Sequence, residues 1–165
     1  MFTNNWHKAW VASWSGVRGP TFIGTDNKLY AITPSPSIRF SYSNGSINGS
    51  GGVAFGTGST PPTINDYYLS GSNITTLSVG SATSAKYDDQ KHEFSCIYTI
   101  TNTGDSDVTI SEVAMFNSWG TSAVTGYNTA CGFMIDRTVL DAPVTIPAGG
   151  IGQVTYTIQV NIPEA

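Results

Sequence analysis

The residues that could act in acid–base catalysis are few and stand apart in the sequence. His7 lies in a tryptophan-containing segment near the N-terminus, and His92 precedes Glu93 at the start of an alternating run. General acid–base catalysis needs a titratable group that a neighbouring group positions and tunes. Neither histidine has such a neighbour at a recognisable spacing, and no G-x-S-x-G segment supplies a nucleophilic serine. The sequence therefore predicts a protein that is not an enzyme.

Acidic residues in the segment GDSDVTISE are the best candidates for binding calcium. The segment contains Asp105, Asp107 and Glu112. Their spacing does not match an EF-hand loop, and D-x-D between two strands is typical of a turn. The glycine-rich segment GTGST at 56–60 lacks the lysine of a phosphate-binding loop. We therefore expect no metal ion and no cofactor.

An acidic and a basic residue, Asp136 and Arg137, stand side by side in the stretch CGFMIDRTVLDAPVTIPAGG at 131–150. Adjacent residues of a strand point to opposite faces of the sheet, so these two side chains cannot cooperate directly. The pattern predicts that a strand ends here and a loop begins. The carboxylates expected to have structural roles are those of Asp105, Asp107, Glu112 and Asp136.

Charge is sparse along the chain and excludes some partners. Only 11% of the residues are charged, and the net charge is −4. Because the basic residues are scattered singly, no patch could neutralise a row of phosphates, so we expect no direct nucleic-acid binding and no polybasic membrane anchor. The start of the chain does not resemble a signal peptide, and no apolar run is long enough to span a membrane. We expect synthesis in a host cytoplasm and two reduced, buried thiols, Cys96 and Cys131.

Alternation of apolar and polar residues identifies strands in the second half of the chain. Phe94, Cys96, Tyr98 and Ile100 share one phase, and the run from 154 to 160 alternates in the same way. Between residues 108 and 116 the apolar phase slips. The slip predicts a β-bulge near Ser111–Glu112, or a strand that is buried on both faces at its end.

Short runs cut by glycine and proline fill residues 40–80, and no long amphipathic helical pattern interrupts them. Such spacing is typical of a sandwich or barrel. We therefore predict an all-β fold, an antiparallel two-sheet β-sandwich that is Ig-like or jelly-roll-like, with about seven to nine strands. The sandwich domain is expected over residues 38–165.

Three tryptophans, Trp6, Trp10 and Trp14, recur every four residues near the N-terminus. This spacing fits one stripe of a helix and equally one face of a strand. Good N-caps at Thr3 and Asn4, with a glycine after the segment, favour a short helix over 4–15.

The tryptophan stripe has to pack against something, because three exposed indoles would invite aggregation. Residues 1–37 are therefore predicted to form an N-terminal docking segment, which is a short helix followed by the stiff connector TPSPS at 33–37. Two alternatives remain open. The tryptophans cover an end of their own sandwich, or they are a protein interface with another copy or with a capsid or tail surface.

Three longer segments follow one another in a characteristic order between Val53 and Ile158: GTGSTPPTINDYYLSG at 56–71, ITNTGDSDVTISEVAMF at 100–116 and FMIDRTVLDAPVTIPAGGIGQVTYTI at 133–158. In this order they resemble structural proteins of tailed-bacteriophage virions. The opening TNNWHKAW is similar to the start of such proteins. The matching residues are Gly58, Thr60, Pro62, Asp66, Tyr67 and Leu69, then Ile110, Glu112, Val113 and Phe116, then Asp136, Arg137, Thr138, Val144, Thr145, Ile146 and Tyr156.

The resemblance implies a non-enzymatic virion component whose partners are other virion proteins (capsid, portal or neck, or tail) and further copies of itself. An auxiliary capsid (decoration) protein is favoured slightly over a neck, tail or fibre component. The alternative function is a glycan-binding adhesion module of a phage tail or cell surface, because four tryptophans and eight tyrosines could form a sugar-stacking platform. Exposure of several aromatic rings on the sandwich distinguishes the two.

Overall fold

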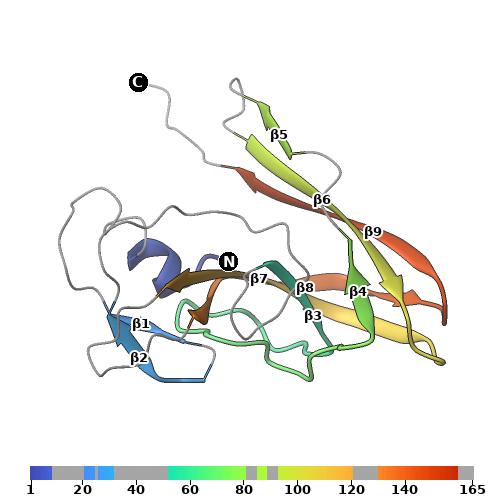
Figure 1. The fold of residues 1–165 in the computed structure, drawn as a ribbon, viewed down its shortest axis with the longest axis horizontal. Coiled ribbons are helices and arrows are strands. Elements are labelled where there is room, and N and C mark those ends of the chain that lie inside the picture. The colour runs from blue at the N-terminus through green and yellow to red at the C-terminus, as the bar shows by residue number, and fades with distance from the viewer. Residues whose placement is uncertain are drawn as a thin grey trace.

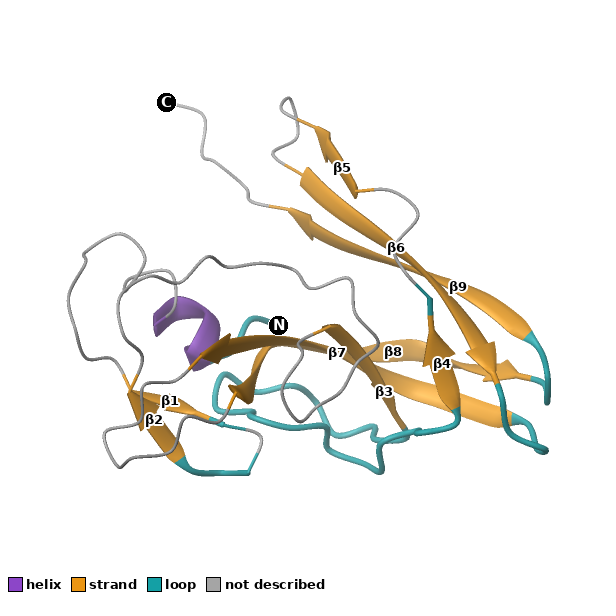
Figure 2. Cartoon of the chain, in the orientation of Figure 1, coloured by secondary structure: helices purple, strands orange, loops and turns teal. Residues whose placement is uncertain are grey.

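The computed structural model describes residues 1–8, 21–24, 26–31, 52–80, 85–88, 93–120 and 130–159. Within these ranges the chain forms nine strands and one short helix at 4–8 (Figures 1 and 2). The strands are β1 (Thr21–Ile23), β2 (Leu29–Ala31), β3 (Gly52–Gly56), β4 (Leu77–Val79), β5 (Ala85–Asp88), β6 (Glu93–Asn102), β7 (Val108–Gly120), β8 (Ala130–Ile146) and β9 (Ile151–Gln159). No helix among the described residues is long and apolar enough to cross a membrane.

Two antiparallel sheets pack on each other, which confirms the predicted all-β two-sheet sandwich. One sheet has the order β3-β7-β8. The other is built around β6, which pairs with β4 and β5 along one edge and with β9 along the other. Figure 1 shows the sheets closest near the turns that join β6 to β7 and β8 to β9, and diverging toward β5. The hairpin of β1 and β2 forms a separate small sheet.

The main core lies between the two sheets. Cys96, Tyr98 and Ile100 of β6 are buried there, whereas the residues between them in sequence are half-buried. Val113 and Met115 of β7 belong to the same cluster. The period of two in β6 therefore reflects one face on the core and one face outside, as the sequence predicted.

The sheet of β3, β7 and β8 is buried on both faces along β3, residues 112–116 of β7 and residues 132–137 of β8. All five residues of β3 are buried. On the face turned away from the second sheet, Ala54, Ala114, Phe116 and Met134 form a smaller cluster with Leu69 from outside the strands. This face is covered by residues 57–73, the covering loop, which runs between β3 and β4 (Figure 1). Burial on both faces explains why β7 loses its simple alternation.

The predicted irregularity near Ser111–Glu112 is confirmed. Ile110 pairs with Val144 and Glu112 pairs with Val139, so two residue steps along β7 lie opposite five along β8. The additional residues belong to β8. The ladder between β7 and β8 is interrupted between these two pairs and resumes on both sides of them, as at a β-bulge.

The prediction that a strand ends at Asp136–Arg137 is wrong, because both residues lie in the middle of β8. A second register shift lies opposite Asp136, because Met115 of β7 pairs with Asp136 and the next residue, Phe116, pairs with Met134. Pro143 also lies within β8 rather than at the start of a new strand. Proline is tolerated there because β8 is the last strand of its sheet, where an N–H can be missing without loss of a ladder bond.

The N-terminal residues lie against β8 and the core. Phe2 pairs with Asp136, and the Thr3 amide donates to the Ile135 carbonyl at 3.0 Å. Trp6 stacks on Phe2 with ring centroids 4.8 Å apart and packs against the inter-sheet core. Of the predicted helix over 4–15, residues 4–8 are helical and the rest lies outside the described residues, as does the connector 33–37.

The predicted docking segment contains a hairpin that the sequence did not indicate. Its strands β1 and β2 pair from Thr21 with Ala31 to Ile23 with Leu29. The Asn5 side chain fixes the hairpin to the helix, because it donates to the Ile23 carbonyl at 2.8 Å and accepts from the Ile23 amide at 3.0 Å.

Candidate functional site: a buried arginine cluster under the covering loop

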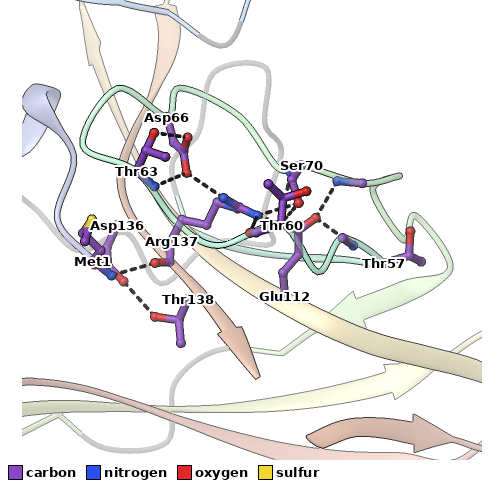
Figure 3. Close-up of polar contacts among 12 residues, drawn as sticks. Met1, Thr57, Thr60, Thr63, Asp66, Ser70, Glu112, Asp136, Arg137 and Thr138 are labelled. Atoms are coloured by element: carbon purple, nitrogen blue, oxygen red, sulfur yellow. Dashed lines mark hydrogen bonds and ion pairs between the residues drawn. The ribbon is translucent and has the colours of Figure 1, made fainter. Parts of the chain in front are cut away.

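Arg137 of β8 and Glu112 of β7 project beneath the covering loop (Figure 3). Their side chains are 2% and 0% exposed. Arg137 Nε donates to Glu112 Oε2 at 2.7 Å, and Arg137 Nη1 donates to Asp66 Oδ2 at 2.6 Å. One buried guanidinium therefore pairs with two carboxylates, one from the sheet and one from the loop. We call Arg137, Glu112, Asp66, Ser70 and Thr60 the Arg137 cluster.

The Glu112 carboxylate gathers donors from both ends of the covering loop. Its Oε1 accepts from the amides of Gly58 at 3.0 Å and Gly71 at 2.8 Å. Its Oε2 accepts from the Ser70 amide at 3.0 Å and from the Ser70 hydroxyl at 3.1 Å, besides the arginine. Burying a charge is costly unless it is paired and hydrogen-bonded. Glu112 meets that condition with partners from two segments of the loop.

Arg137 holds the middle of the same loop. Its Nη2 donates to the Thr60 carbonyl at 2.6 Å and to the Ser70 hydroxyl at 2.5 Å. Asp66, which receives Nη1, also accepts from the amide and the hydroxyl of Thr63 at 2.9 and 2.6 Å. The cluster therefore fixes the loop at its start, middle and end.

Glycines allow this close approach. A Cβ at Gly58 would lie 2.5 Å from both Glu112 Oε1 and the Gly71 nitrogen, and closer still to the Ser70 hydroxyl. A Cβ at Gly71 would collide with the Gly58 backbone. A side chain at either position would push the loop away from the carboxylate.

Electrostatics keep the cluster ionised. Burial by itself raises the pKa of Glu112, but hydrogen bonds from Arg137, Gly71 and Ser70 outweigh it, so the pKa lies below its usual value. Burial also raises the pKa of Asp66, but hydrogen bonds from Thr63 and Arg137 outweigh this effect, so the pKa of Asp66 lies below its usual value. The pKa of Arg137 is raised, since its bonds to Glu112 and Asp66 exceed the effect of burial. Groups that stay charged near neutral pH are poor proton donors and acceptors, so the cluster is suited to holding structure.

The other predicted candidates lie apart from this cluster. The Asp136 side chain pairs with the Met1 amine at 2.9 Å, whereas the Arg137 side chain pairs with Asp66 and Glu112, in agreement with the opposite directions of the two side chains. Asp105 is exposed, and Asp107 accepts from the Ala148 amide at 3.1 Å. His7 is exposed. His92, Trp10 and Trp14 and the side chain of Cys131 lie outside the described residues.

Cys96 is a free thiol in the core, and burial raises its pKa despite an opposing hydrogen bond with Tyr98. A buried thiol with a raised pKa reacts slowly. Within the described ranges, no group of three or more His, Cys, Asp or Glu side chains is placed to hold a metal ion.

Sequence reasoning missed the cluster itself. A signal was present, because charged residues are rarely fully buried unless paired, and Glu112 and Arg137 each interrupt an apolar strand pattern. Only 11% of the residues are charged, so two charged residues that interrupt apolar strand patterns on different strands can be expected to pair with each other.

The fold and the cluster together define an antiparallel two-sheet β-sandwich in which one sheet carries a loop fixed by a buried ion-pair network. Residues from the three sequence segments 56–71, 100–116 and 133–158 meet in that network. Thr60 and Asp66 come from the first segment, Glu112 from the second and Arg137 from the third. No protein-family model, curated protein or solved structure matches this chain.

Proposed function

We propose that this chain is a non-enzymatic structural component of a bacteriophage virion. An auxiliary capsid (decoration) protein is favoured, with a neck, tail or fibre component next. The observation that carries the proposal is the convergence of the three resembling segments on the Arg137 cluster. The residues of these segments that meet in the cluster have one common physical role, which is to hold the covering loop on the sheet.

A structural role agrees with the chemistry of the cluster. Its charged groups are ion-paired with one another, and hydrogen bonds join them to the loop. Buried ion pairs contribute little net stability compared with an apolar core, but they can specify a single conformation. Here the ion pairs fix the conformation of the covering loop on one outer surface of the sandwich. The copies of a subunit in a regular assembly need such a surface to have the same shape.

The proposed partners are other virion proteins and further copies of this chain, and the proposed location is the virion after synthesis in the host cytoplasm. The interface formed by Trp6, Trp10 and Trp14 remains part of the proposal. Trp6 packs against its own core, so Trp10 and Trp14 are the residues through which contact with a neighbour is expected.

The proposal is tested on particles purified from cells that express this chain. Mass spectrometry is expected to find the chain in a constant ratio to the capsid protein, and electron microscopy is expected to locate it on the particle. Glu112→Gln should reduce incorporation because it releases the covering loop, whereas Asp105→Asn, which alters an exposed turn carboxylate, should incorporate normally. Recovery of the chain only in the particle-free lysate would contradict the proposal.

A further inference from the structure

A hollow of about 530 Å³ lies beside the Arg137 cluster, between the covering loop and the β1–β2 hairpin. A volume of this size suits a small organic ligand. The hollow is lined by Asp26, Asn27, Thr60, Pro61, Thr63, Asn65, Asp66, Tyr67, Tyr68, Leu69, Ser70 and Arg137. Its lining therefore combines two aromatic rings with amides, hydroxyls and carboxylates.

Several hydrogen bonds hold the wall formed by the covering loop. Asp66 is held by Arg137 and by Thr63, as Figure 3 shows. The next residue toward the N-terminus, Asn65, accepts a hydrogen bond on its side-chain oxygen from Asn4 Nδ2 at 2.9 Å. The Asn4 amide also donates to the Ile64 carbonyl at 2.8 Å. A preformed wall lowers the ordering cost of binding a ligand.

Two tyrosines contribute to the lining of the hollow. Tyr67 and Tyr68 are adjacent in sequence, half-buried, and both line the hollow. Tyr68 also packs on the apolar cluster beneath the loop, with its ring centroid 6.4 Å from that of Phe116. A tyrosine presents an apolar ring together with a polar hydroxyl. This pairing suits a ligand that has both C–H faces and hydroxyl groups.

The charges in the hollow determine which ligands are compatible. Among the described residues that line it, the one cation is Arg137, which is already paired with Asp66 and Glu112. Asp26 lies 3.5 Å from Lys28, which is not part of the lining. The lining therefore has two carboxylates against one shared guanidinium, so an anionic ligand would be repelled.

From these observations we propose that the hollow binds a neutral saccharide. The tyrosine rings contact the C–H faces of the sugar, and the exposed amides of Asn27 and Asn65 with the carboxylate of Asp26 bond its hydroxyls. The inference goes beyond the proposed function, since it concerns one hollow of the isolated subunit and needs no assembly.

The test is saturation-transfer NMR and titration of the full chain with a panel of neutral sugars: glucose, galactose, mannose, N-acetylglucosamine, maltose and lactose. At least one of them is expected to bind in the millimolar range or tighter. Tyr67→Ala should weaken that binding roughly fivefold or more through loss of the ring contact. Asn27→Gly should weaken it roughly fivefold through loss of the amide.

The two variants are chosen to leave the fold intact. Asn27 has φ of 60°, a conformation that glycine adopts freely, so Asn27→Gly removes the amide without straining the backbone. Leu29→Ser is the matched control, because Leu29 lies in the same hairpin, is 69% exposed and does not line the hollow. It should bind as the natural chain does.

The proposal is overturned if no sugar of the panel binds, if binding survives both Tyr67→Ala and Asn27→Gly, or if sialic acid or glucuronic acid binds more tightly than the neutral sugars. None of these outcomes affects incorporation into particles. Failure of the sugar site and failure of the virion proposal are therefore distinguishable.

Discussion

Glu112 illustrates how one residue can hold a loop against one face of a sheet. Its carboxylate is 0% exposed and accepts from Arg137, Ser70, Gly58 and Gly71. Removing one partner of a buried pair leaves the other charge uncompensated, which costs more than the intact pair contributes. The residue is therefore sensitive to changes that keep its size but alter its charge.

Glu112→Gln is expected to destabilise the protein by about 3–5 kcal/mol, because it removes one of the two carboxylates paired with Arg137 and turns an NH₂ group toward backbone donors. Urea unfolding followed by tryptophan fluorescence measures the change. Asp105→Asn, at an exposed turn position, should stay within about 0.5 kcal/mol of the natural chain. A loss below about 1 kcal/mol in Glu112→Gln would mean that the cluster does not hold the loop.

Asn102 is a second residue with a joining role, at the end of β6. Its side-chain nitrogen donates to the carbonyls of Ser106 at 2.8 Å and of Ile146 and Pro147 at 3.1 Å. Its side-chain oxygen accepts from the Gly104 amide at 3.0 Å. One buried amide thus joins the turn after β6 to the turn between β8 and β9.

Asn102→Asp should cost about 2–4 kcal/mol of unfolding free energy, because a carboxylate placed among three carbonyl oxygens is repelled and cannot donate. Asn73→Asp is the control, because it makes the same chemical change at a residue that is only half-buried. Chemical denaturation of both variants gives the comparison. Equal stability of the two would show that the Asn102 amide bonds contribute nothing net.

Among the larger elements, the covering loop depends on close backbone contact. The amides of Gly58 and Gly71 both reach Glu112 Oε1, and no Cβ fits at either glycine. The loop therefore lies on the sheet through a backbone approach that only glycine permits. Leu69 and Tyr68 of the loop then seal the apolar face beneath it.

Gly58→Ala is expected to lose about 1–3 kcal/mol, the usual cost of forcing an extra methyl group into a packed site. Gly80→Ala is the control, because the nearest atom to its added Cβ would be 3.4 Å away, an ordinary contact. Thermal unfolding of the two variants should separate them clearly. Similar melting temperatures would mean that the loop shifts to admit a methyl group without strain.

For the whole molecule, the ionised cluster makes stability depend on acid. The pKa values of Glu112 and Asp66 are lowered from their ordinary 4.5 and 3.8 in the folded state. Their contribution is fully present above the pKa values of the unfolded chain and is lost as the pH falls through those of the folded chain. Stability should therefore be level near neutrality and fall below pH 4.5.

Urea unfolding across this acid range measures the effect. Glu112→Gln should show a shallower fall than the natural chain, since one of the two linked carboxylates is gone. Parallel slopes in the two proteins would show that other carboxylates account for the acid sensitivity.

The N-terminal tryptophans are expected to divide between two roles. Trp6 packs on the core, so Trp6→Ala should lower the free energy of unfolding by about 2 kcal/mol, less than for a fully buried ring. The double variant Trp10→Ala/Trp14→Ala should keep its stability but lose self-association or incorporation into particles. Sedimentation velocity and urea unfolding test both parts. A stability loss in the double variant as large as that in Trp6→Ala would assign all three rings to the subunit's own core.

The sequence by itself determined the sandwich, the face of β6 that is buried and the position of the break in pairing near Ser111–Glu112. These features follow from local periodicity, because a strand with one face on the core must alternate, and a slip in that alternation marks a break in register. Where a strand is buried on both faces, as β8 is around residues 132–137, the alternation disappears and the length of the strand cannot be predicted from its pattern.

Only the tertiary structure decided the Arg137 cluster and the hollow beside it. Arg137 is 25 residues from Glu112 and 71 from Asp66 along the chain. No local spacing relates these residues, because the register of β7 with β8 and the path of the covering loop bring them together. Paired charges can be buried in a core only when several segments supply their partners at once, and that is a property of the folded chain.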